Sequence, residues 1–205
     1  MLPIAPRMSS TGLVLALLLP LAAGCSRVLT SSGVRVRSSE RGAMLEPRVV
    51  SSGYRWQDAS TADIYVSDIP MERLAGADTL ADLSGSIVRI HMFLRPRPGR
   101  TPIETTASSV TIHCAVLARG EVGIYGGGGF LFPSGKPGDD SFGGSIEDGS
   151  VRLLVSTPGF LDQLGAAEFA AGVVAPEDES AAAIMEHLFE HASRVARGEA
   201  TATGG

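Results

Sequence analysis

Cysteine, lysine and aromatic residues are scarce in this sequence. Two of its 205 residues are cysteine, 5% are aromatic, and Lys136 is the only lysine. An apolar run at 11–24 is shorter than the about 20 residues that a membrane-spanning helix needs, and Pro20 interrupts it. No G-x-S-x-G motif occurs, so the sequence offers no serine-hydrolase triad. We predict no catalytic residues and no cofactor.

The N-terminus has the pattern of a secretory signal. Arg7 precedes the apolar run and small residues close it, which is typical of a signal peptide with its cleavage site. The segment LAAGCS at 21–26 resembles the lipobox of bacterial lipoproteins, although Ala22 stands where that family usually has leucine. The resemblance covers residues 1–26 only.

This resemblance implies a lipid-anchored protein. Residues 1–24 would be removed as a signal peptide, and Cys25 would be acylated on its sulfur and on its new amino group. Two or three acyl chains hold a protein stably at a membrane. We therefore expect a location in the cell envelope, with the outer membrane or the periplasmic face favoured because Ser26, not aspartate, follows the cysteine. The alternative is an ordinary secretory signal with Cys25 as an incidental thiol.

The charge of the chain restricts its partners. The formal net charge is −5, and acidic residues outnumber basic ones most strongly after residue 138. Nucleic-acid binding needs a clustered basic face, so we expect no nucleic acid as a partner. The expected partners are a membrane, through the lipid on Cys25, and another protein of the envelope.

The mature chain is expected to form one domain. Residues 26–53 are rich in Ser, Arg and Gly, so we predict a flexible tether at 25–54, with pairing of 44–50 as an edge strand as the alternative. With 44% hydrophobic residues the chain can bury a core, which we place in a globular domain at 55–198. Residues 199–205 are predicted to be a disordered tail.

Alternating apolar residues predict strands at 61–69, 86–95 and 108–117. In the second of these, Val88, Ile90 and Met92 share one face, and Arg89 and His91 lie on the other. A tight turn at 118–121 leads into a partner strand at 122–126. A hairpin with its turn at 147–149, a short helical turn at 157–165 and a last strand at 168–175 follow.

The C-terminal segment predicts an amphipathic helix that begins at Pro176 and ends at Gly198, because apolar residues recur at intervals of three and four. Its apolar stripe must pack against the strands. The predicted fold is therefore mainly β (α+β), an antiparallel β-sandwich-like domain with the C-terminal helix packed against it.

The glycine run at 126–129, followed by Ser-Gly-Lys, suggests a phosphate loop at first sight. The motif fails because Phe130 stands where its first glycine belongs and Pro137 replaces the hydroxyl residue after Lys136. We predict no nucleotide binding. The glycines instead indicate a bend between strands or a close approach of backbones. The loop after them is a candidate binding loop, through Ser134, Lys136, Asp139 and Asp140.

The sequence HLFEH in the C-terminal helix resembles the H-x-x-E-H zinc motif of the inverzincin metalloproteases. The resemblance implies that His187 and His191 would bind zinc and that Glu190 would act as base. That family takes a third, glutamate ligand far downstream, whereas only Glu199 follows here. We therefore predict no metal site and keep these three residues as candidates for one.

Three further residues have ordinary interpretations. His91 and His113 lie on the less hydrophobic faces of adjacent predicted strands, so they could be cross-strand neighbours, and no additional ligand points to a metal. Cys114 has no disulfide partner if Cys25 is acylated, and we expect it to be a small buried hydrophobe.

The sequence thus predicts a membrane-anchored lipoprotein of the cell envelope with a non-catalytic binding or scaffolding domain. Two alternatives stay open: a metal-dependent hydrolase that uses the HLFEH motif, and a structural subunit of an envelope complex.

Overall fold

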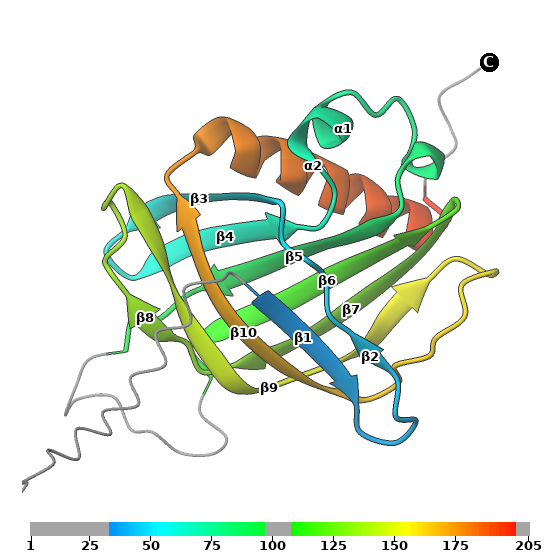
Figure 1. The fold of residues 1–205 in the computed structure, drawn as a ribbon, viewed down its shortest axis with the longest axis horizontal. Helices are drawn as coiled ribbons and strands as arrows, with labels where there is room; N and C mark the ends of the chain where they lie inside the picture. The colour runs from blue at the N-terminus through cyan, green and yellow to red at the C-terminus, as the bar shows by residue number, and fades with distance from the viewer. Residues whose placement is uncertain (1–32, 97–107, 200–205) are drawn as a thin grey trace, which may run out of the picture.

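The computed structural model describes residues 33–96 and 108–199. Within them one antiparallel sheet curls over on itself, and a long helix lies along its outer face (Figure 1). The strands are β1 (Gly33–Ser38), β2 (Met44–Leu45), β3 (Ser51–Asp58), β4 (Thr61–Ser67), β5 (Gly85–Met92), β6 (Val110–Ala118), β7 (Glu121–Gly129), β8 (Phe132–Ser134), β9 (Ser141–Ser156) and β10 (Ala167–Pro176). The helices are α1 (Met71–Ala75), the 3₁₀ helix η1 (Leu80–Asp82) and α2 (Glu179–Ala196).

The strand order is β2-β1-β10-β9-β7-β6-β5-β4-β3, with β8 paired to the first part of β9. Curling brings β3, at one end of this order, close to the end of β10, where Tyr54 of β3 forms an isolated bridge with Glu177. The backbone N–H of Asp178 also donates to the Tyr54 carbonyl at 3.2 Å. The predicted mainly antiparallel β fold is confirmed.

The inner face of the curled sheet holds one hydrophobic core. Val88, Ile90 and Met92 of β5 point into it, as the alternation predicts, together with the buried rings of Tyr54 and Phe142. Cys114 lies in the same core, where burial raises the pKa of its thiol to about 12. Its predicted role as a small buried hydrophobe is confirmed.

The outer face carries a second core beneath α2 and α1. Ile87 and Leu117 of the sheet pack there against Met185 and Leu188 of the helix, so the predicted packing of the C-terminal helix is confirmed. The helix begins at an Asp178 cap, whose carboxylate accepts the Ala181 N–H at 2.9 Å. Gly198 follows the helix with a φ of +73°, a conformation that suits glycine.

The predicted tether at 25–54 is wrong from residue 33 onward. β1 is paired with β10 in the sheet, and Val34 and Val36 of β1 enter the inner core. β2 pairs with β1 at the edge of the sheet, and β3 pairs with β4. Arg35 and Arg37, two of the residues that suggested a flexible segment, occupy outward positions of β1, whereas Ser38 is buried. The apolar alternation of β1 is short but sufficient. The globular domain therefore begins by residue 33, not 55.

Two local predictions after β7 are also wrong. The predicted hairpin at 144–156 is a single long strand, β9, and its expected turn at 147–149 is an irregularity in the pairing of β9 with β10. β9 carries one extra residue there, which bends the strand without reversing the chain. Residues 157–165 form turns and bends, and no helix occurs within that range.

The glycine run lies within β7, which continues through Gly129 between β6 and β9. A Cβ on Gly127 would overlap the carbonyl oxygen of Ser150, and one on Gly126 would overlap the side chain of Leu154. These glycines therefore permit the close approach of backbones that the sequence suggested, and the chain does not bend there into another strand.

Residues 1–24 and Cys25 lie outside the described residues. Among the helices that the structure describes, none has the length and apolar character needed to cross a membrane.

Candidate functional site

A cleft of about 760 Å³ separates the C-terminal half of α2 from the outer face of the sheet. The sheet contributes side chains from β5, β6, β7 and β9, and α2 with the residue that follows it contributes the rest. The lining residues are Arg89, His113, Ile124, Leu154, Val155, His187, Phe189, Glu190, Ser193, Arg194 and Arg197. Its volume is that of a typical small-molecule site.

The cleft is positively charged although the protein is acidic. Arg89, Arg194 and Arg197 face one carboxylate, Glu190. Arg197 forms an exposed pair with Glu199 at 2.9 Å, and such pairs contribute little. Arg194 takes part in none of the ion pairs found within residues 33–96 and 108–199. The lining can therefore offer guanidinium groups to an anion.

Arg89 is held in place by a buried carboxylate beside the cleft. Asp63 in β4 is 2% exposed, and its Oδ1 accepts the Arg89 Nε–H at 2.9 Å. His91 Nδ1 lies 2.9 Å from the same oxygen, and Arg55 Nε lies 3.9 Å from Oδ2. Asp63 engages Nε, and within the described residues the two terminal nitrogens of Arg89 make no hydrogen bond, so they can donate to a ligand.

The Asp63 cluster also joins the sheet to α2. Arg55 donates through a terminal nitrogen to the Glu186 carboxylate of the helix, which also accepts the Tyr65 hydroxyl at 3.3 Å. Arg89 lies over the Tyr65 ring, with its guanidinium carbon 5.9 Å from the centroid. The helix and the arginine are thus positioned by one connected set of polar groups.

His113 lines the cleft and carries an unsatisfied polar atom. Its Nδ1 is buried and has no hydrogen-bond partner within the described part of the chain. Burial, Arg89 and His91 lower the pKa of His113, so the ring is neutral near pH 7. Buried polar atoms in native proteins nearly always have a partner, which can be an ordered water molecule, so a bound water is the expected partner of this nitrogen.

Apolar side chains line another part of the cleft. Ile124, Leu154 and Phe189 line it, and the Phe189 ring packs against His113 with centroids 5.8 Å apart. The missing side chain of Gly126 makes room for Leu154. A ligand here would meet both cationic and apolar side chains.

The candidate zinc motif does not come together at one place. His187 and Glu190 line the cleft, whereas His191 is half-buried outside the lining. Within the described residues, no group of three or more His, Cys, Asp or Glu side chains is arranged to hold a metal ion. His91 and His113 share a face of the sheet as expected, but His113 pairs with Arg89 and His91 pairs with Thr111, so they are diagonal neighbours.

The candidate binding loop lies at the other end of the sheet. Ser134, Asp139 and Asp140 line a shallow hollow of about 560 Å³. The Asp139 carboxylate accepts the backbone N–H of Lys136 at 2.8 Å, which closes the loop on itself. The Lys136 side chain does not line this hollow.

Sequence analysis missed the buried Asp63 cluster. The charged positions of 86–95 placed Arg89 and His91 on one face, but their shared partner lies in another strand. The signal that could have revealed it was an aspartate inside the apolar strand 61–69, since a buried carboxylate needs a cation or donors.

Comparisons with known proteins add no family or relative. The chain matches no family model, and neither the curated proteins nor the solved structures contain a match to it.

Proposed function

We propose that this chain is a non-catalytic binding protein of the cell envelope, held at a membrane by lipid on Cys25, and that the α2 cleft binds an anion with an apolar body. The observation that carries the ligand proposal is Arg89, which lines the cleft and is held at Nε by buried Asp63. Arginine binds carboxylates and phosphates through paired N–H groups.

The apolar wall selects among anions. Inorganic phosphate would use the guanidinium groups but leave Leu154 and Phe189 uncovered. A carboxylate with a hydrocarbon chain would use both, because burial of apolar surface contributes roughly 25 cal/mol per Å². We therefore expect decanoate to bind, inorganic phosphate to bind less tightly, and decanol to bind least.

Thermal unfolding of the protein with each probe tests the ligand. Decanoate at about ten times its Kd would add about 1.4 kcal/mol of stability, which raises Tm by about 3–6 °C in a chain of this size. The double variant Arg194→Gln/Arg197→Gln should lose most of this shift, and Arg37→Gln, an exposed arginine of β1, should keep it. Equal shifts with decanoate and decanol, or full shifts in the double variant, would refute the proposed ligand.

The anchor needs a separate experiment. In cells fed a fatty-acid analogue, the wild-type chain should become labelled and Cys25→Ala should not. Equal labelling of the two would mean that Cys25 is not the attachment site, whatever the cleft binds.

Two other functions follow from the sequence. A metal-dependent hydrolase would need a cation near His187 and Glu190, where three arginines oppose its binding, and zinc analysis of the purified protein tests it. A structural subunit would be recovered with fixed partners when a tagged form is isolated from membranes.

A further inference from the structure

Exposed apolar side chains gather at one end of the sheet. Trp56, Phe93 and Phe132 are 44%, 46% and 45% exposed, and Leu94 is exposed beside Phe93. The Phe130 and Phe132 rings lie 5.1 Å apart. We call these five residues the aromatic end.

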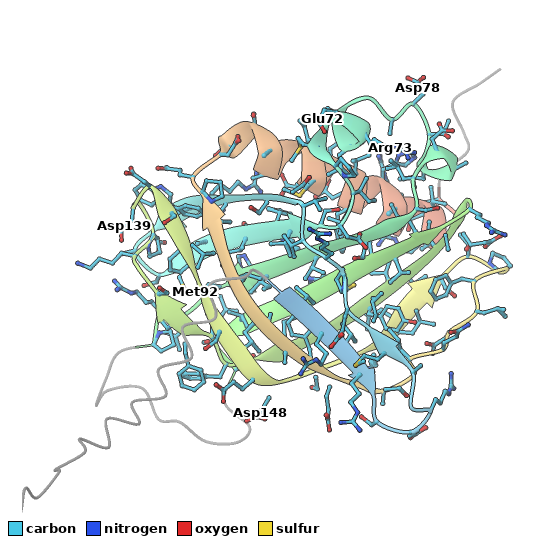
Figure 2. All side chains as sticks on the ribbon, viewed as in Figure 1. Glu72, Arg73, Asp78, Met92, Asp139 and Asp148 are labelled. Atoms are coloured by element: carbon cyan, nitrogen blue, oxygen red, sulfur yellow. The ribbon has the colours of Figure 1, made fainter. Side chains whose placement is uncertain are left out.

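The strand register shows that they belong to one edge of the molecule. Trp56 pairs with Ala62, Ala62 with Met92, Met92 with Val110, and Val110 with Gly129. Phe93 directly follows β5 and Phe130 directly follows β7, beyond this row. Figure 2 labels Met92 and Asp139 at this end of the sheet, far from Asp78 near α1.

Single exposed apolar residues are common on proteins, but a contiguous group usually marks an interaction surface. Trp56 has the character of an interfacial residue, because its indole N–H donates to Glu177 at 2.8 Å while nearly half of the residue faces solvent. Tryptophan and tyrosine are enriched at membrane–water interfaces because they combine an apolar ring with a polar tip.

The described chain also begins at the aromatic end. Gly33 pairs with Gly172, Gly172 with Ser145, and Ser145 with Phe132. Three strand spacings amount to about 14 Å. Cys25 precedes Gly33 by eight positions in the sequence, a distance of at most about 28 Å in extended chain. Lipid on Cys25 would therefore keep this end close to the bilayer.

The charge of the surrounding residues selects the type of lipid. Asp58, Asp139, Asp140 and Glu177 lie on the segments that frame the aromatic end, and they outnumber the two cations of these segments, Arg95 and Lys136. Anionic head groups attract lysine and arginine, and carboxylates are repelled by them. The surface fits a neutral, zwitterionic interface, entered by aromatic rings.

We propose that the aromatic end is a membrane-facing surface, which inserts its exposed rings among the head groups of the bilayer that holds Cys25. This inference rests on the anchor in the proposed function and is independent of the ligand. It also orients the molecule. α2 begins beside Tyr54 and extends for 18 residues, about 27 Å, so the cleft at its far end would open toward water.

The single tryptophan makes this directly measurable. The chain from Cys25 onward is coupled through the Cys25 thiol to phosphatidylcholine vesicles that contain maleimide lipid. Cys114 will not react, because it is 1% exposed and burial raises the pKa of its thiol to about 12. Trp56 emission is recorded on ordinary vesicles and on vesicles with brominated acyl chains. Chemical coupling makes the result independent of whether cells acylate Cys25.

On coupling, Trp56 emission should shift to shorter wavelength, and brominated lipid should quench it about twofold. Phe132→Ser should reduce this quenching. Leu161→Ser is the control and should leave it unchanged: Leu161 is 80% exposed, but it follows Thr157, whose backbone bonds to Val122 near the β6–β7 turn, away from the aromatic end. Unchanged emission without quenching would overturn the proposal. A blue shift without quenching would also overturn it, since that result indicates contact between protein copies.

Discussion

Replacement of Asp63 by asparagine tests whether the buried cluster positions the cleft. The substitution keeps the size of the side chain and removes its charge. It leaves the partly buried Arg89 without its carboxylate, and His91 and Arg55 lose the same partner. We expect both a loss of stability and a weaker anion site.

The structure sets the magnitude of the stability effect. Loss of one partner from a buried ion pair costs about 3–5 kcal/mol. Here the Arg89 and His91 side chains are 24% and 29% exposed, so water replaces part of the interaction. The amide oxygen of the variant also retains one acceptor, so the cost should be about 2–3 kcal/mol. That corresponds to a decrease in Tm of about 4–12 °C.

Urea unfolding followed by circular dichroism measures the difference, and Glu46→Gln is the matched control. Glu46 pairs with Arg35 on the surface, where the side chains are 47% and 62% exposed, so its loss should cost less than about 1 kcal/mol. If Asp63→Asn unfolds at the same urea concentration as Glu46→Gln, the Asp63 cluster does not have the role described. The decanoate shift should be smaller in Asp63→Asn than in Glu46→Gln.

Three further predictions concern pH, packing and capping. The pKa of His113 is lowered in the folded protein, so below the ordinary value of 6.5 the unfolded chain binds more protons than the folded one. Wild type should therefore lose stability as pH falls from 6.5 through the folded pKa. In urea unfolding compared at about pH 8 and about pH 5, His113→Gln should lose less. Gly127→Ala should lower stability by about 3 kcal/mol, because its methyl group meets the Ser150 backbone; in the control Gly128→Ala the closest atom is the Ser108 hydroxyl, which can rotate, so thermal unfolding should show a smaller loss. Asp178→Ala should cost about 1 kcal/mol in urea unfolding through loss of the α2 cap, and no loss would mean that the cap is not formed in solution.

The sequence was sufficient for elements whose periodicity is strong and local. β5 and β6 alternate cleanly between an inner apolar face and a mixed outer face, and the stripe of α2 matches the side that it buries. The β6–β7 turn was also predicted correctly, and in the structure Arg119 and Gly120 both take the positive φ that a tight hairpin requires.

Elements that depend on distant partners were not predictable in this way. β1 has only two inward valines, and it forms a strand because its backbone pairs with β10. The sequence of β9 predicts a hairpin because the residues at 147–149 favour a turn. In the structure, pairing with β7, β8 and β10 along its length keeps β9 extended. The cleft likewise combines Arg89 with residues of α2 that lie a hundred positions away, and only the folded chain shows that they meet.

The pairing of β1 with β10 also fixes when the protein can finish folding. Gly33 pairs with Gly172, so the first strand has its main partner only after nearly the whole domain has been synthesised. Sheets built on such distant pairings fold slowly, in milliseconds to seconds. In a protein that crosses a membrane N-terminus first, the segment before β1 would emerge long before β10. Cleavage and acylation at Cys25 would then act on a chain whose sheet is still incomplete, and closure of the sheet would follow attachment to the membrane.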